Sequence, residues 1–218
     1  IFAFLNYLPY SKHFYIILAI PNTYYKPLIP KGEMKNMKNV EQEVSYIFKP
    51  ELAPANGEDQ TKNAATIGFG AKDVFDLSWK NLLDAYACTE CGRCTAACPA
   101  NITGKLLSPR KIMMDTRDRM EEVRKNIKEN GSFKDDGKTL VHNYITVEEL
   151  RACTSCNACV EECPVSINPL SIIFELRRSL IMEESNAPAE WNAMFSNIEN
   201  NFAPWKFSPD ERDAWKNA

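Results

Sequence analysis

Apolar residues from position 73 onward recur at the spacing of helix faces, and the runs begin and end with recognisable capping residues. Ser78 predicts the start of a helix whose apolar side is formed by Trp79, Leu82, Leu83 and Tyr86. Ser108 and Pro109 start a second helix, which we expect to run to about Asn130 and to end at Gly131. Its partial apolar stripe consists of Ile112, Met113, Met120, Val123 and Ile127.

Further helices are predicted in the second half of the chain. Thr146 and Glu149 form a capping box, and Asn168 followed by Pro169 starts the next helix. The inner side of that helix is predicted to hold Leu170, Ile173, Phe174, Leu176, Leu180 and Ile181. We expect another helix from Ala189 to about Asn200, and the residues from Ser208 cap a last one. The fold class is therefore predicted to be mainly α.

Eight cysteines stand between these helices in two runs of the same spacing, C-x2-C-x2-C-x3-C-P. The first run is Cys88, Cys91, Cys94 and Cys98, and the second is Cys153, Cys156, Cys159 and Cys163. A predicted helix precedes and follows each run, so the chain repeats a unit of helix, cysteine loop and helix. The first cysteines are 65 positions apart, more than compact bacterial ferredoxins use. This favours a helical ferredoxin-type domain.

The spacing is typical of the ligands of two 4Fe-4S clusters. Three cysteines of such a run wrap one cluster, and the fourth, before proline, ligates the cluster of the other run. We therefore assign Cys88, Cys91, Cys94 and Cys163 to cluster 1, and Cys153, Cys156, Cys159 and Cys98 to cluster 2. Structural zinc and a disulfide framework are the alternatives, although zinc modules usually show paired C-x2-C knuckles. The prediction is a pair of clusters that conducts electrons.

Other polar residues near the runs are weaker candidates. Thr89, Thr95, Thr154 and Ser155 can donate hydrogen bonds to cluster sulfurs or can simply cap local turns. Arg93 can raise the reduction potential of a cluster or face solvent. His142 is interpreted as a surface or packing histidine, with a proton role as the alternative. No nucleotide loop, H-E-x-x-H motif or nucleophile elbow is present, so no catalytic residue is predicted.

The first thirty residues differ from the remainder of the chain. Positions 1–20 are largely apolar and aromatic, but Pro9, Ser11 and Lys12 interrupt them. We interpret residues 1–30 as the end of a membrane-spanning helix, a break and an interfacial segment, with a soluble apolar element as the alternative. Lys26, Lys31, Lys35 and Lys38 form a basic stretch on the presumed cytoplasmic side. Prolines and glycines predict a linker over residues 31–72, ahead of a two-cluster domain over residues 73–218.

Charge and cysteine usage narrow the class of protein. The formal net charge is −3, which does not favour nucleic acid as a partner. Since all eight cysteines belong to the two runs, no disulfide is expected, and a reducing compartment suits thiolates that hold clusters. We therefore expect this domain to face the cytoplasm.

Residues 73–218 resemble the iron-sulfur domain of the heterodisulfide-reductase-like oxidoreductases. That family includes the reductase's C subunit, the iron-sulfur part of its D subunit, and the iron-sulfur subunit of anaerobic glycerol-3-phosphate dehydrogenase. The matching motifs are CTECGRCTAACP, CTSCNACVEECP and the trailing NFAPWKFSPDERDAWKNA. In that last segment Asn201, Pro204, Trp205, Arg212 and Trp215 fit the family pattern. The resemblance implies a redox partner, namely a cysteine-rich oxidoreductase module that holds the catalytic centre.

The amino-terminal segment resembles the cytoplasmic end of a membrane domain like the gamma subunit of nitrate reductase. Its signature is PYSKHF, from Pro9 to Phe14. The resemblance implies that the chain is a fragment of a larger protein at the cytoplasmic face of the inner membrane, beside a membrane haem or quinone module. It makes His13 a possible haem b ligand, whereas Tyr15 stands where a relative would tend to have a second histidine.

These observations favour a relay of single electrons between the membrane module and the oxidoreductase module. One alternative is the iron-sulfur subunit of a succinate or fumarate oxidoreductase, although no plant-type 2Fe-2S run precedes Cys88. Another is an iron-sulfur redox sensor or scaffold. We do not expect the chain to be catalytic by itself.

Overall fold

The computed structural model describes residues 1–34, 36–52, 68–206 and 208–217. Within these ranges the regular elements are helices, and the only pairing of strand type is an isolated bridge between Val141 and Ile145. The predicted, mainly α fold is confirmed. The predicted basic residue Lys35 lies outside the described residues.

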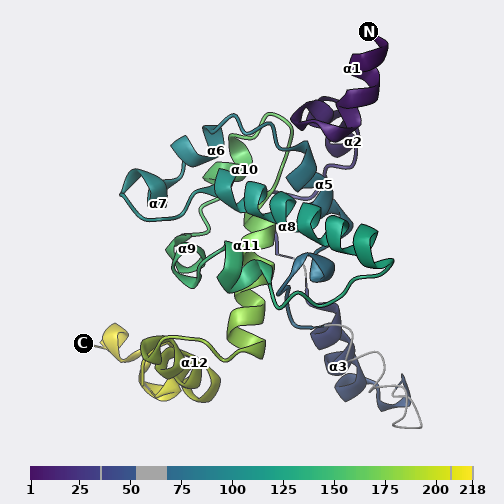
Figure 1. Cartoon of the computed structure of the whole chain (residues 1–218). Coiled ribbons are helices and arrows are strands. Elements are labelled where there is room, and N and C mark those ends of the chain that lie inside the picture. Colours follow the sequence, from purple (N-terminus) through teal and green to yellow (C-terminus); the bar gives the residue numbers. More distant parts are fainter. Residues whose placement is uncertain (35, 53–67, 207, 218) are drawn as a thin grey trace.

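The helices follow one another along the chain in this order (Figure 1). The α-helices are α1 (Phe2–Tyr7), α2 (Tyr15–Tyr24), α3 (Lys38–Phe48), α5 (Trp79–Ala87), α6 (Arg93–Ala96), α7 (Pro99–Ile102), α8 (Pro109–Asn130), α9 (Val147–Ala152), α10 (Ala158–Glu161), α11 (Pro169–Arg178) and α12 (Ala189–Asn201). Short helical turns are η1 (Leu8–Tyr10), η2 (Lys12–Phe14), η3 (Pro50–Leu52), η4 (Val74–Asp76), η5 (Leu140–Tyr144), η6 (Ser179–Glu183), η7 (Pro209–Glu211) and η8 (Ala214–Asn217).

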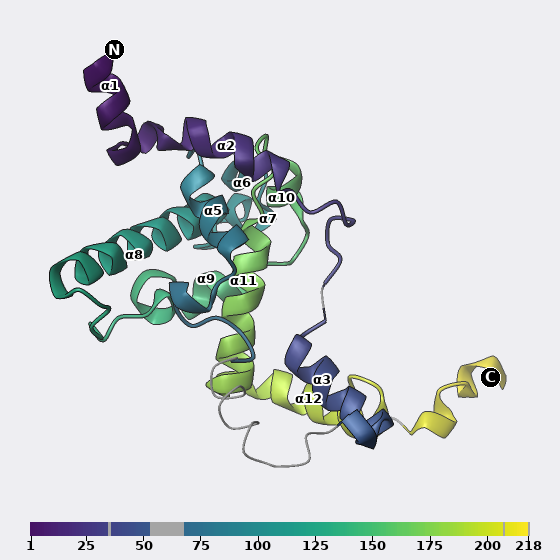
Figure 2. The ribbon, with the colours of Figure 1, turned by 90° about the vertical axis from the view of Figure 1, so that its right-hand side faces the viewer.

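Helix α11 forms the centre of the cluster domain, and α5, α8 and α9 pack around it (Figures 1 and 2). Its Ile172, Ile173 and Leu176 have no exposed surface. They belong to one continuous core that also includes residues of α5, α8 and η5. Cys88 and Cys98 of the first run belong to this core and Cys153 and Cys163 of the second run pack against it, so the core fixes the two loops relative to each other.

The predicted helix starts are confirmed. The side-chain oxygens of Ser78, Ser108 and Asn168 accept hydrogen bonds from backbone amides in the first turns of α5, α8 and α11, and Gly131 ends α8 with a φ of 77°. Thr146 and Glu149 form the predicted capping box of α9. The helix expected from Ala189 is α12, whereas the residues after Ser208 form only short turns.

The predicted buried faces are partly wrong. Trp79 is 61% exposed, and α5 instead buries Asn81, Asp84, Ala85 and Ala87. On α8, the predicted Ile112, Met113 and Val123 are buried, Met120 is partly buried and Ile127 is exposed. On the helix after the second run, Leu170, Ile173, Leu176 and Leu180 are buried as predicted, whereas Phe174 and Ile181 are only partly buried. The periodicity of apolar residues does not show which polar side chains are buried together with hydrogen-bonding partners.

The amino-terminal segment contains the predicted break. Helix α1 ends at Tyr7, and two short turns separate it from α2. No helix among the described residues is long and apolar enough to cross a membrane, so the predicted end of a membrane-spanning helix is not observed. Many apolar side chains of this segment are nevertheless exposed: Ile1, Phe2, Phe4, Leu5, Tyr7, Tyr10, Ile16, Ile17, Ile20, Tyr24, Tyr25, Leu28 and Ile29. This run of exposed residues is the apolar face of the segment.

A buried polar network joins α2 to the cluster domain. The fully buried Asn22 donates a hydrogen bond of 3.0 Å to the carbonyl of Val165, just after the second cysteine run. Lys80 donates to Asn22 at 2.8 Å and to Asp84 at 2.6 Å. Burial raises the pKa of the Asp84 carboxyl, which also accepts a hydrogen bond of 3.4 Å from the backbone of Asn168. The network therefore ties α2, α5 and the segment that follows Cys163 into one body.

Part of the predicted linker is structured. Residues 38–48 form α3, and the backbone amide of Ala71 donates a hydrogen bond of 3.0 Å to the carbonyl of Glu175 on α11. A Cβ atom at Gly70 would stand 2.4 Å from the backbone of α11, so glycine is required for this close approach. Gly70 and Ala71 thus pack against α11, just ahead of the boundary that the sequence predicts at residue 73.

A buried arginine holds the long helix α8 to the preceding chain. Arg119 has no exposed surface, and its guanidinium donates to Asp73 at 2.7 Å and to Asp136 at 2.6 Å. It also donates to the carbonyl of Lys138 at 2.7 Å. Hydrogen bonding to this arginine lowers the pKa of the Asp136 carboxyl to about 2. The ion pairs join η4, α8 and the connector before η5.

Candidate iron-sulfur site

Equivalent helices deliver the first cysteine of each run. Helix α5 ends at Cys88 with φ and ψ of −65° and 120°, and α9 ends at Cys153 with −69° and 125°. Both cysteines therefore leave the helix in the same extended conformation. The repeated unit that the sequence predicts, helix, cysteine loop and helix, is confirmed at this junction.

The two loops also share an uncommon backbone conformation. Glu90 and Ser155, each two positions after the first cysteine, have φ of 57° and 58°. Gly92 and Asn157, each four positions after it, have φ of 82° and 62°, and each precedes a one-turn helix, α6 or α10. A positive φ is unfavourable for most residues, so two matched pairs indicate that both loops follow one path. That path aims the amide of Ser155 at the sulfur of Cys153, 3.4 Å away.

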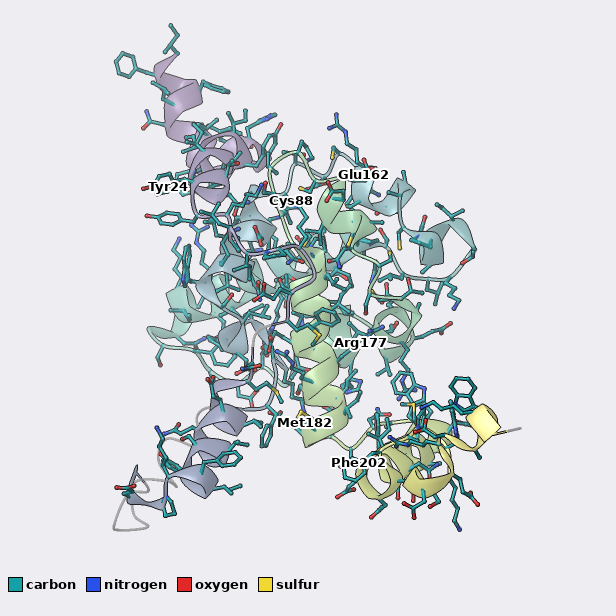
Figure 3. All side chains as sticks on the ribbon, turned by 180° about the vertical axis from the view of Figure 1, so that it is seen from behind. Tyr24, Cys88, Glu162, Arg177, Met182 and Phe202 are labelled. Carbon is teal, nitrogen blue, oxygen red and sulfur yellow. The ribbon has the colours of Figure 1, made fainter. Side chains whose placement is uncertain are left out.

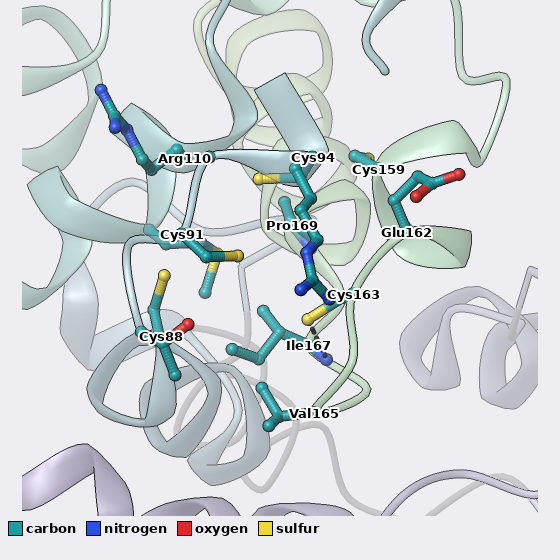
Figure 4. A pocket seen from close by; sticks show the side chains of 14 residues that line it. Cys88, Cys91, Cys94, Arg110, Cys159, Glu162, Cys163, Val165, Ile167 and Pro169 are labelled. Atoms are coloured by element: carbon teal, nitrogen blue, oxygen red, sulfur yellow. Dashed lines mark hydrogen bonds between the residues drawn. The ribbon is translucent and has the colours of Figure 1, made fainter. Parts of the chain in front are cut away.

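The fourth cysteine of the second run lies with the first run. Cys163 lines a hollow together with Cys88, Cys91 and Cys94, and Cys159 of the second run also borders it. The four sulfur atoms point toward a common space (Figure 4). The amide of Ile167 donates to the sulfur of Cys163 at 3.3 Å, which orients this side chain. The residues predicted to hold cluster 1 are thus brought together.

The remaining cysteines form a second set. Burial raises the pKa of the Cys153 thiol, and nearby Cys98 and Cys156 raise it further by their charge. Burial likewise raises the pKa of Cys159 to about 12, and the charges of Cys153, Cys94, Cys98 and Cys156 add to that effect. Cys98 therefore lies close to the second run. The side chain of Cys94 also packs against Cys159, so the two sets adjoin.

The donor set fits two cubane clusters. In the predicted assignment each set contains four thiols from both runs, and every thiolate of a cubane binds its own iron at a separate corner. Among the residues that the structure describes, no three His, Cys, Asp or Glu side chains form a group for a single metal ion. Burial raises the pKa of Cys88 to about 11, so the free thiol keeps its proton. It must lose that proton to bind iron as a thiolate.

The hydroxyl groups predicted near the sulfurs have mixed roles. Amide and hydroxyl hydrogen bonds, the side chain of Thr89 among them, lower the pKa of Cys91. Burial raises the pKa of Cys94, against a hydrogen bond with the hydroxyl of Thr95. The same hydroxyl lies 2.9 Å from that of Ser108, so Thr95 also supports the start of α8. Ser155 contributes its amide rather than its hydroxyl to a sulfur. Arg93 is exposed, as predicted, although it lines the hollow.

Neither histidine lines the cysteine hollow. His142 lies 2.8 Å from the carboxylate of Glu184, in agreement with its predicted surface or packing role. The ring of the exposed His13 lies 6.3 Å from the ring of Tyr15. Its possible contact with haem remains a prediction, because haem would belong to a neighbouring domain.

Sequence reasoning missed two arginines beside the loops. Arg117 on α8 forms an ion pair with Glu90 of the first loop. Arg177 lies on α11 (Figure 3). It donates to the carbonyl of Leu150 at 2.6 Å and to the hydroxyl of Ser155 at 3.3 Å. Each arginine stands nine positions after the N-cap residue of its helix. This shared position was visible in the sequence once the two helices were aligned by their caps.

Residues 87–167 match the family described as the 4Fe-4S dicluster domain. The chain is 28% identical to the probable iron-sulfur-binding oxidoreductase FadF of Bacillus subtilis, over 98% of this chain and 31% of that protein. It is 27% identical to the EtfAB:quinone oxidoreductase of Syntrophomonas wolfei, over 98% of this chain and 29% of that protein. It is also 32% identical to a probable membrane-anchored ferredoxin of Chromohalobacter salexigens, over 67% of this chain and 24% of that protein. The chain therefore spans less than a third of each of these relatives.

The predicted resemblance to heterodisulfide reductases is confirmed. Over 46% of its length, the chain is 32% identical to the C subunit of the ferredoxin/F420H2-dependent CoB-CoM heterodisulfide reductase of Methanosarcina acetivorans, and the match spans 49% of that relative. Its relatives are thus iron-sulfur oxidoreductases, and its own cysteine loops lie within a dicluster domain. The cofactors are two 4Fe-4S clusters, and the domain has an electron-transfer role.

Proposed function

We propose that this chain is the electron relay of a larger membrane-associated oxidoreductase, with its clusters held by ligands exchanged between the two runs. In this proposal Cys88, Cys91, Cys94 and Cys163 hold cluster 1, and Cys153, Cys156, Cys159 and Cys98 hold cluster 2. The observation that carries the assignment is the position of Cys163 in the hollow of the first run. The contact between Cys94 and Cys159 supports a short path between the two sets.

Each cluster, when bound, supplies a site that accepts and releases one electron. The protein residues set how readily this happens. The amides of Ser155 and Ile167 donate to the sulfurs of Cys153 and Cys163, which favours added negative charge there. Buried core residues around α11 keep the loops in place, and the exposed Cys91 and Cys156 lie where a partner can approach. The chain thereby provides a fixed path and leaves the chemistry of the substrate to other parts of the protein.

The partners proposed for this chain are a cysteine-rich oxidoreductase module and a membrane haem or quinone module. One relative is an oxidoreductase that acts between EtfAB and quinone. The chain aligns with that relative over nearly its whole length but covers only 29% of it, which leaves room for both modules elsewhere in such a protein. Mixing the loaded chain with a reduced flavoprotein of the Etf class and recording cluster bleaching would identify a donor of this kind.

We further propose that the apolar face of residues 1–29 lies against the cytoplasmic side of the inner membrane. Its aromatic and aliphatic residues are largely exposed, exposed apolar patches often mark membrane contacts, and one relative is a probable membrane-anchored ferredoxin. The triple variant Phe2→Ser, Phe4→Ser, Leu5→Ser should bind phosphatidylglycerol vesicles at least about tenfold more weakly in co-sedimentation. The control variant Phe195→Ser, Ile198→Ser changes exposed residues of α12 and should bind normally. Equal binding by the unmodified chain, the triple variant and the control variant would contradict the proposal.

Iron and acid-labile sulfide measured on the anaerobically prepared chain test the relay directly. We expect about eight of each per chain, and an electron paramagnetic resonance spectrum of two interacting reduced clusters after dithionite. Two one-electron waves in a redox titration would support conduction. Zinc without labile sulfide would refute it.

A further inference from the structure

Arg117 and Arg177 occupy equivalent places beside the two cysteine runs. Each stands nine positions after the N-cap of the helix that follows its run. Each lies near enough to the first cysteine of that run for its positive charge to act on the thiol: Arg117 on Cys88 and Arg177 on Cys153. Each also contacts the residue two positions after that cysteine, which is Glu90 in one loop and Ser155 in the other.

The two arginines differ in what neutralises them. The charge of Arg117 is balanced by the carboxylate of Glu90. Arg177 bonds only neutral groups among the described residues, namely the carbonyls of Leu150, Arg151 and Cys153 and the hydroxyl of Ser155. The substitution of serine for glutamate at the equivalent loop position thus leaves one positive charge uncompensated beside the second run.

A partly buried charge such as that of Arg177 acts on a neighbouring redox group. Reduction adds one negative charge to a cluster, and a positive charge in a medium of low dielectric stabilises that product. The charges that line the first-run hollow are those of Arg93, Arg110 and Glu162, which are exposed and of mixed sign. Solvent and salt screen exposed charges much more than buried ones.

We propose that Arg177 raises the reduction potential of the second-run cluster above that of the first-run cluster, where Glu90 cancels the equivalent Arg117. This inference rests on the proposed function, because it assumes that both clusters are held as assigned. Electrons that enter the relay then reside preferentially on the cluster beside α11. The arginines act on the clusters through their positive charge and contact no substrate.

Redox titration of the fully loaded chain, followed by electron paramagnetic resonance, tests this order. Arg177→Gln should lower the higher of the two midpoint potentials by about 59 mV, a tenfold change in the equilibrium constant of a one-electron couple. Glu90→Gln should raise the lower midpoint potential by a similar amount, because it leaves Arg117 uncompensated. Each variant should leave the other midpoint nearly unchanged.

Control variants separate charge from structure. Arg177→Lys keeps the positive charge and should retain most of the potential, even though it loses hydrogen bonds to the end of α9. Arg151→Gln removes a neighbouring arginine whose guanidinium bonds Asn186 instead, and should shift neither midpoint by more than about 20 mV, roughly a twofold change. If Arg177→Gln folds poorly, Glu90→Gln still tests the inference through the lower midpoint potential, because this variant removes no hydrogen bond to α9.

The outcomes distinguish this inference from the function beneath it. Three results would overturn the inference and leave the relay intact: neither variant moves a wave, both variants move the same wave, or Arg177→Gln moves the lower wave. A preparation with two full clusters but a single unresolved wave in every variant would also overturn it. The absence of labile sulfide would instead refute the proposed function.

Discussion

Replacing Cys163 with alanine is expected to remove the cluster held by the first run and to spare the other. The sulfur of Cys163 points into the hollow lined by Cys88, Cys91 and Cys94, so its loss leaves one iron of that cluster without a protein thiolate. Iron and labile sulfide should fall from about eight to about four per chain. Cys98→Ala should produce the reciprocal loss.

Paired variants make the exchange of ligands testable. The spectrum that remains in Cys163→Ala should match that of Cys91→Ala, because both remove ligands of one cluster. The spectrum of Cys98→Ala should match that of Cys156→Ala. Glu162→Gln, an exposed neighbour that lines the same hollow, is the control and should keep both clusters. If Cys163→Ala instead resembles Cys156→Ala, each run holds its own cluster and the assignment is wrong.

Replacing Arg119 with methionine is expected to lower the free energy of unfolding by about 3–5 kcal/mol. The substitution leaves two carboxylates, those of Asp73 and Asp136, without the buried guanidinium that now binds them. Urea denaturation of the loaded chain, followed by far-UV circular dichroism, measures the change. Since α8 carries Arg117 and starts beside the first loop, the variant should also lose its clusters at a lower urea concentration.

An exposed position of the same helix provides the control. Arg124 is exposed on α8 and forms no ion pair with the described residues. Arg124→Met also removes a positive charge, but it should change the free energy of unfolding by no more than about 0.5 kcal/mol. A loss of less than about 1 kcal/mol in Arg119→Met would contradict the expectation that the carboxylates of Asp73 and Asp136 need this guanidinium.

The sequence predicted what local chemistry determines. Caps at Ser78, Ser108, Thr146 and Asn168 start helices in the structure because a side-chain oxygen satisfies amides that have no partner in the first turn. The cysteine spacing predicted the cofactor for a similar reason, since three thiolates within seven residues can wrap one cluster. Such signals depend on residues that are close in the chain.

Features that depend on distant residues were missed. Asp84 and Arg119 read as the polar side of a helix, but each is buried with a partner from another segment, the backbone of Asn168 for Asp84 and the carboxylate of Asp73 for Arg119. Trp79, expected to be buried, packs at the surface against Tyr25 with ring centroids 5.4 Å apart. The break near Pro9 that the sequence predicted is present as the turns around Leu8–Tyr10, whereas no helix among the described residues is long and apolar enough to span a membrane. Periodicity gives no information on which partner a polar side chain will meet.

The buried network around Asn22 has a consequence for the rate of the relay. Because Asn22, Lys80 and Asp84 join α2 to the segment after Cys163, α2 is held in place beside the second cysteine run. If the apolar face lies against the membrane as proposed, a haem or quinone module beside it would stay at one distance from the nearer cluster. Electron tunnelling slows steeply with distance, so a fixed distance between α2 and the cysteine loops would give electron transfer a defined rate.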